Sequence, residues 1–118
     1  MNTIELEKHI KSDFLDDDIV KLGISYYSDN GALAMLAMNP KDEYLADVTV
    51  NLPETNLLDK FSFFLNANDT AKAVANNLMD NQIIKRLPMT AASGFNLYHA
   101  YTIIDGNFKK KVAKAINN

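Results

Sequence analysis

The sequence contains no cysteine, only two histidines and only four glycines among its 118 residues. The absence of cysteine excludes disulfides, thiolate metal sites and cysteine nucleophiles. His9 and His99 form no HxxxH or HExxH pattern, so no metal centre is indicated and we expect no cofactor. No P-loop or GxGxxG motif occurs, which leaves nucleotide binding without support. The chain also lacks an apolar run of the roughly 20 residues that cross a bilayer.

The remaining composition is that of an ordinary globular protein. Hydrophobic residues make up 47% of the chain, and the length suits one domain over residues 1–118. A formal net charge of −3 argues against non-specific binding to nucleic acid or to an anionic membrane. The first residues, MNTIELEKHIKSDFLDDD, are too polar for a signal peptide. We therefore expect a soluble cytoplasmic protein without a membrane partner.

Three segments have the spacing of amphipathic helices. Residues 2–14 repeat an apolar side chain every four residues, and Asn2 with Glu5 has the form of a capping box. Residues 71–79 carry a continuous apolar stripe at helical spacing, after an N-cap supplied by residues 66–70. Asp105 is suited to cap a last helix. Its inward positions are expected to be Phe108, Val112 and Ile116.

Alternation of apolar and polar residues predicts strands between these helices. On this basis we expect strands over residues 20–27, 44–52 and 61–65. Residues 32–38 are apolar on both sides and are expected to form a strand inside the sheet. Residues 95–104, rich in Tyr, Ile and Thr, are expected to form a final strand. Residues 83–87 are expected to form a further strand ended by Pro88, with a loop over residues 89–94. Asn30-Gly31 favours a two-residue type I′ turn.

This order of elements predicts the fold class. Hairpin-connected strands with separate helices indicate an α+β domain. We expect an antiparallel meander of about four to six strands, with about three helices packed mainly on one side.

No set of residues stands out as catalytic, and we expect a protein that is not an enzyme. The stretch ASGFN is not a GxSxG nucleophile elbow. A small enzyme would need a site built from Ser93, Tyr98, His99 and Tyr101. Side chains scattered over both faces of the sheet would exclude that site.

Four stretches together resemble an uncharacterised bacterial family labelled as a domain of unknown function. They are YSDNGALAMLAM, YLADVTVNLPE, FSFFLNANDTAKAVANNLMDNQII and KRLPMTAASGFNLYHAYTI. Members are similar in their DNG turn, TVNLP strand and late glycine loop, and are small proteins of phages, plasmids and conjugative elements. The resemblance covers roughly residues 20–104, and residues 61–64 depart from the family pattern. It implies a mobile-element context and no catalytic residues.

From this context we predict a non-enzymatic binding protein whose partner is encoded by the host or by the element. The specific prediction is an inhibitor of a host defence nuclease, such as a CRISPR effector. Acidic side chains would then occupy a basic nucleic-acid channel. The candidate contacts are Asp16, Asp17, Asp18, Asp42 and Glu43.

The alternative is a nucleic-acid-binding accessory or regulatory protein that acts through its C-terminal helix. Positive charge is concentrated there, at Lys109, Lys110, Lys111 and Lys114. No arginine or aromatic residue interleaves with these lysines, as base stacking would require. This alternative is therefore not favoured, and homodimerisation is left open.

Overall fold

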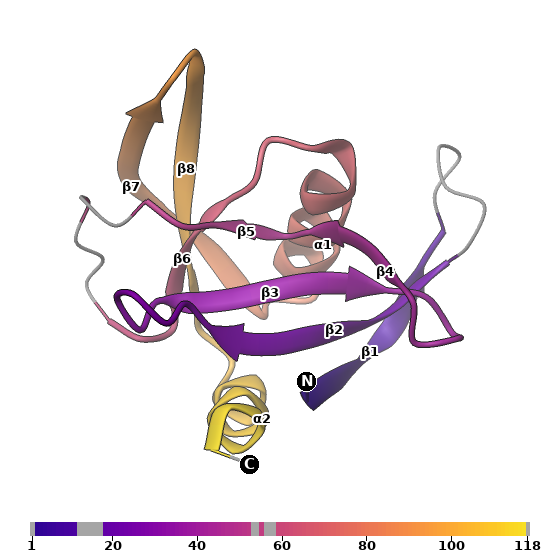
Figure 1. Ribbon diagram of the computed structural model, residues 1–118. Coiled ribbons are helices and arrows are strands. Elements are labelled where there is room, and N and C mark those ends of the chain that lie inside the picture. The colour runs from indigo at the N-terminus through magenta and orange to yellow at the C-terminus, as the bar shows by residue number, and fades with distance from the viewer. Residues whose placement is uncertain (1, 12–17, 53–54, 56–58, 118) are drawn as a thin grey trace.

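Two antiparallel sheets and two helices make up the described part of the computed structural model, which covers residues 2–11, 18–52, 55 and 59–117 (Figure 1). Each sheet has four strands. The class is mixed helix and sheet as expected, but the prediction of a single meander with about three helices was wrong. Helical and strand side chains from both sheets share one buried core.

The first sheet is a meander in which each strand pairs with the next along the chain. Its strands are β1 (Asn2–Ile10), β2 (Ile19–Tyr26), β3 (Leu33–Met38) and β4 (Tyr44–Asp47). In β3 every second side chain is buried, because successive residues of a strand point to opposite faces, whereas β2 is buried on both faces over most of its length. These inward residues include Ile4, Leu6, Leu22, Ile24, Leu33 and Met35.

Residues 2–10 of the first predicted helix form the strand β1, and residues 12–14 of that prediction lie outside the described residues. Leu6 and Ile10 are buried as expected, but so is Ile4, which a strand places on the same face. A repeat of four residues is also a multiple of two, so the pattern fitted both conformations. Asn2 does not form a capping box; its Nδ2 donates to the carbonyl oxygen of Ala115, 2.7 Å away.

The turn between β2 and β3 is longer than predicted. The N–H of Tyr27 donates to the Ala32 carbonyl at 2.8 Å, and the N–H of Gly31 donates to the Tyr27 carbonyl at 2.7 Å. Four residues therefore lie in the loop, and Gly31 (φ 70°) is the one with a left-handed backbone. A two-residue type I′ turn needs positive φ at both central positions, so that prediction was wrong.

The expected strand over residues 44–52 passes from one sheet to the other. It is divided into β4 and β5 (Thr49–Val50) at the buried residue Val48. The N–H of Val48 donates to Met35 of β3 at 2.9 Å, and its carbonyl accepts from Asn66, which follows β6, at 2.8 Å. Val48 is thus hydrogen-bonded toward both sheets and forms the corner between them.

The second sheet has the order β5-β6-β8-β7. It adds β6 (Ser62–Leu65), β7 (Ile84–Ser93) and β8 (Asn96–Ile103). The prediction that Pro88 ends a strand was wrong, since β7 continues through it to Ser93. The register of β7 on β8 shifts between Arg86 and Thr90, and Pro88 lies in this irregular stretch. A bulge on an edge strand tolerates proline because no ladder hydrogen bond is lost there.

Two helices complete the core, and both were expected. Helix α1 (Asp69–Asp80) begins after Asn68, whose Oδ1 accepts from the Ala71 N–H at 2.7 Å. Helix α2 (Gly106–Asn117) is capped by Asp105, whose Oδ2 accepts from the Phe108 N–H at 2.8 Å. The two helices lie on different sides of the β3 strand in the view of Figure 1. Their buried residues include Val74, Leu78, Phe108 and Val112.

Candidate functional site

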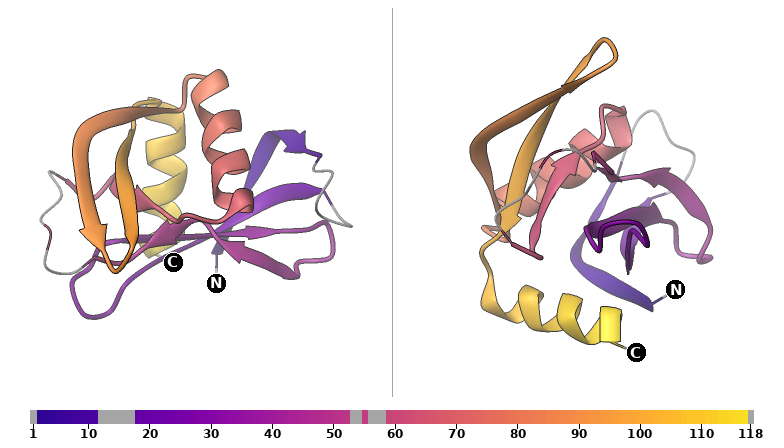
Figure 2. Two further views of the ribbon diagram at one scale, coloured as in Figure 1. Left: turned by 90° about the horizontal axis from the view of Figure 1, so that it is seen from above. Right: turned by 60° about the vertical axis from the view of Figure 1, so that its left-hand side comes forward.

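The hairpin formed by β7 and β8 projects beyond the rest of the second sheet (Figures 1 and 2). β6 pairs with β8 only at Thr102, Tyr101 and Ala100. The pairing between β7 and β8 continues past this point to Ser93 and Asn96. The distal half of the hairpin is therefore a two-stranded ribbon, and we call residues 87–99 the arm.

The tip of the arm presents large apolar side chains to solvent. Gly94 has φ 61° and occupies the first central position of the two-residue turn between Ser93 and Asn96, as a type II′ turn requires. Phe95, the second turn residue, is fully exposed at 109%, and Leu97 is 56% exposed. The turn chemistry thus fixes a phenylalanine at the outermost point of a hydrogen-bonded ribbon.

The arm and its base carry no carboxylate. Between Ile84 and Ile103 the charged residues are Lys85 and Arg86. The whole chain has 12 Lys and Arg against 15 Asp and Glu, so the remainder holds ten of the cations and all fifteen carboxylates, a formal charge of −5. Arg86 also contacts the His99 ring across the hairpin, with Nη2 3.0 Å from Nε2. The molecule is therefore electrostatically divided, with a weakly basic hairpin on an acidic body.

The four residues of the small-enzyme alternative do not gather in one place. Tyr98 and His99 are successive residues of β8 and therefore point to opposite faces. Tyr101 is buried and stacks on Phe63, with ring centroids 5.9 Å apart. Ser93 lies at the tip, paired with Asn96. These side chains cannot act together as nucleophile, base and orienting group.

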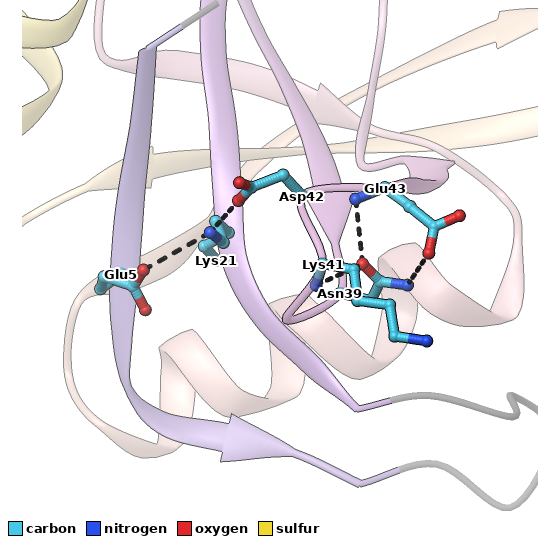
Figure 3. A network of polar contacts seen from close by, with 6 residues as sticks. All are labelled: Glu5, Lys21, Asn39, Lys41, Asp42 and Glu43. Carbon is cyan, nitrogen blue, oxygen red and sulfur yellow. Dashed lines mark hydrogen bonds and ion pairs between the residues drawn. The ribbon is translucent and has the colours of Figure 1, made fainter.

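Two of the predicted acidic contacts belong to a polar network around the β3–β4 turn (Figure 3). Asp42 is ion-paired with Lys21, which also lies 3.7 Å from Glu5. The hydrogen bond to Asp42 is the main reason that the pKa of Lys21 is raised above its usual 10.5. Glu43 accepts a hydrogen bond from Nδ2 of Asn39 at 3.2 Å. Both carboxylates therefore have partners within the chain.

The other predicted acidic contacts are only partly within the described structure. Asp16 and Asp17 lie outside the described residues. Asp18 directly precedes β2 and is half-buried. Of the five predicted acidic contacts, the structure therefore describes Asp18, Asp42 and Glu43.

The predicted lysines lie on α2, and they differ in their surroundings. Lys109 is half-buried, with its Nζ 5.4 Å from the centroid of the Phe61 ring, a cation–π contact. Lys110, Lys111 and Lys114 are exposed. Lys111 and Lys114 border a hollow shared with Glu5 of β1, so a carboxylate lies near this positive charge. Among the described residues no group of three or more His, Cys, Asp or Glu is placed to hold a metal ion.

Comparison with known proteins identifies the family. Residues 21–116 match the domain of unknown function DUF4313, so the chain belongs to this family. No curated protein and no solved structure matches significantly. No helix among the described residues is long and apolar enough to span a membrane. The match assigns no activity and no source, and the predicted origin in phages or plasmids stays a prediction.

Sequence reasoning missed the arm. Residues 89–94 were expected to be a loop, whereas Met89–Ser93 continue β7. The signal was present in Gly94-Phe95, because a Gly-X pair between two extended segments is typical of a two-residue type II′ hairpin.

Proposed function

We propose that this protein is a non-enzymatic binding protein that docks onto a partner protein through the arm. One observation carries the proposal: Phe95 and Leu97 are exposed at the end of a projecting ribbon. Neither side chain belongs to the buried core. An exposed phenylalanine at an outermost point is therefore not explained by folding.

The physical basis is the gain that such a side chain makes on burial. Aromatic residues dominate binding energy at interfaces because they remove a large apolar area from water at a small cost in side-chain entropy. Exposed apolar groups that lie together commonly mark an interaction site. The ladder of hydrogen bonds between β7 and β8 orders the tip before binding, which lowers the entropic cost of association.

Within this class, inhibition of a host defence nuclease is the specific role that the resemblance in sequence suggests. We now place the main contact at the arm rather than at the acidic residues. Asp42 and Glu43 already have partners within the chain, so a binding groove would have to compete with them.

The test is to express a tagged chain in a bacterium that encodes a member of this family. The chain is then purified with nuclease treatment and a moderate-salt wash. The proposal expects one protein at stoichiometric amount with the wild type, and at least tenfold less with Phe95→Ala. Tyr44→Ala is the matched control, because Tyr44 is 59% exposed but lies on β4, away from the arm. Equal recovery with wild type and Phe95→Ala would overturn the proposal.

Nucleic-acid binding through α2 is the second candidate, favoured by the exposure of Lys110, Lys111 and Lys114. The two candidate functions are distinguished by titrating a fluorescent DNA duplex with the wild type and with a variant in which Lys110, Lys111 and Lys114 are all replaced by alanine. Binding that falls with salt and disappears in the triple variant would support it. Binding to the captured protein should not change in that variant if the arm is the docking element.

A further inference from the structure

A hollow of about 230 Å³ lies on the outer face of the first sheet, and none of the described residues that line it belongs to the arm. Every second residue of β3 is buried in the core, so Ala34 and Leu36 project from the opposite face. Ser25 of β2 is paired with Ala34, and Asp47 of β4 is paired with Leu36. Directly opposed residues carry their side chains on the same face, so these four residues border one outward hollow.

An aromatic side chain also lines the hollow, next to its acidic group. This residue is Tyr27, which follows β2. Its hydroxyl lies 2.9 Å from Oγ1 of Thr49 in β5, a hydrogen bond that holds the side chain in place. Burial raises the pKa of the Tyr27 phenol, and the charge of Asp47 raises it further, so these two groups lie close together. Apolar surface, an aromatic ring and one carboxylate therefore meet at the hollow.

Within the described part of the chain, the carboxylate of Asp47 has no cation as a partner. Both ion pairs found there are made by Lys21, with Asp42 and with Glu5. The backbone carbonyl of Asp47 accepts from Asn68, but the carboxylate itself is exposed. Ten cations and fifteen carboxylates lie outside the β7–β8 hairpin, a formal charge of −5, and this field attracts a cation. The hollow is thus complementary to a positive charge carried on an apolar stem.

We propose that this hollow binds an arginine side chain presented by a partner protein. The guanidinium pairs with Asp47 beside the ring of Tyr27, and the methylene groups cover Ala34 and Leu36. Arginine suits the site better than lysine, because a planar guanidinium can form two hydrogen bonds with a carboxylate and stack on an aromatic ring. Leu36 is only half-buried, so the backbone of a protein partner has apolar surface to cover. The inference goes beyond the proposed function, since the arm takes no part in it.

The first test titrates the isotope-labelled full chain with the blocked tripeptide acetyl-Ala-Arg-Ala-amide and follows the backbone amides by NMR. The guanidinium is the only charge of this probe. We expect saturable shifts centred on the amides of Ser25, Tyr27, Ala34, Leu36 and Asp47. A tripeptide with citrulline, the uncharged analogue of arginine, should bind roughly fivefold more weakly. Equal binding of the two tripeptides, or no saturable shift at these amides, would overturn the inference.

A second test removes the carboxylate from the protein. Asp47→Asn keeps the backbone carbonyl that accepts from Asn68, and it should weaken binding of the arginine tripeptide roughly fivefold. Asp42→Asn is the matched control, because it removes an exposed carboxylate that Lys21 already holds, and it should leave this binding unchanged. The amide spectrum of each variant shows that it is folded. An equal loss in both variants would mean that only net charge matters, and the site would be refuted.

A third probe distinguishes a protein partner from a free small molecule. Propylguanidinium is the arginine side chain without a backbone, and it should shift the same amides but bind more weakly than the tripeptide. If it binds as tightly, only the guanidinium is recognised and the assignment to a protein partner is wrong. Phe95→Ala should bind the tripeptide as the wild type does. Failure of this inference therefore leaves the proposed function to its own test, the loss of the captured protein in Phe95→Ala.

Discussion

Asn39 organises the β3–β4 turn through its side chain. It is 2% exposed, and its Oδ1 accepts from the N–H groups of Lys41 and Glu43, each at 2.9 Å. Asn39→Ala would leave two backbone donors without this acceptor in a turn where Asp42 has φ 63°. We expect a loss of about 2 kcal/mol in unfolding free energy, measured by urea denaturation. Lys41→Ala, an exposed substitution in the same turn, should cost less than about 0.5 kcal/mol.

Lys21 makes stability depend on pH at the alkaline end. Its pKa in the folded protein is raised above 10.5, chiefly by the hydrogen bond that Lys21 donates to Asp42. Above pH 10.5 the folded state therefore binds more protons than the unfolded state, and stability falls as pH rises. Burial raises the pKa of Tyr27 as well, which acts in the same direction. The contribution of Lys21 must therefore be taken from a comparison of variants.

We expect the stability difference between wild type and Lys21→Gln to be constant at neutral pH. It should shrink as pH rises through 10.5 and beyond. Asp42→Asn removes the main cause of the shift and should weaken this alkaline decline. The stabilities of the wild type, Lys21→Gln and Asp42→Asn are measured by thermal denaturation at a series of pH values from 7 to 11.5. A difference that stays constant over that range would contradict the assignment.

At the scale of elements, the start of α1 depends on Asn68. Its Oδ1 caps the Ala71 N–H, and its Nδ2 donates to the Asp47 carbonyl at the end of β4, 2.9 Å away. Asn68→Ala should destabilise the fold by about 1 kcal/mol, the usual cost of a lost N-cap. Asn68→Ser keeps the cap and loses only the bond to β4, so it should recover most of that cost in the same denaturation assay. Equal losses in both variants would show that the cap contributes little.

At the scale of the whole molecule, the arm and the core are separable. Residues 88–99 contribute no member to the buried core, and Leu87 and Ala100 lie where a short hairpin would close. Replacing residues 88–99 by Asn-Gly should therefore leave a protein that unfolds cooperatively, with stability changed by less than about 1 kcal/mol. Circular dichroism and urea denaturation check the fold. The same variant should lose the captured protein.

Much of the fold followed from patterns within a few residues of one another. The stripe from Ala71 to Leu78, the cap at Asn68 and the cap at Asp105 are confirmed as features of α1 and α2. Helical spacing and capping are local, since the hydrogen bonds join residues three or four positions apart. Alternation of side chains likewise predicted β2 and β6, whereas β3 was predicted from a run of apolar residues and β8 from its content of Tyr, Ile and Thr.

Other features were decided only by the tertiary structure. Residues 4–10 satisfied both a helical and a strand pattern, and β1 is a strand because β2 supplies a paired neighbour. In the sequence Val48 is an ordinary position of one expected strand. In the structure its backbone hydrogen bonds join Met35 of the first sheet and Asn66, which follows a strand of the second sheet. The exposure of Phe95 depends on β6 ending near Leu65, which leaves the end of β8 without that neighbour. The sequence by itself determined which segments could be helices or strands. Which strands became neighbours, and which ribbon was left exposed, depended on contacts between residues far apart in the chain.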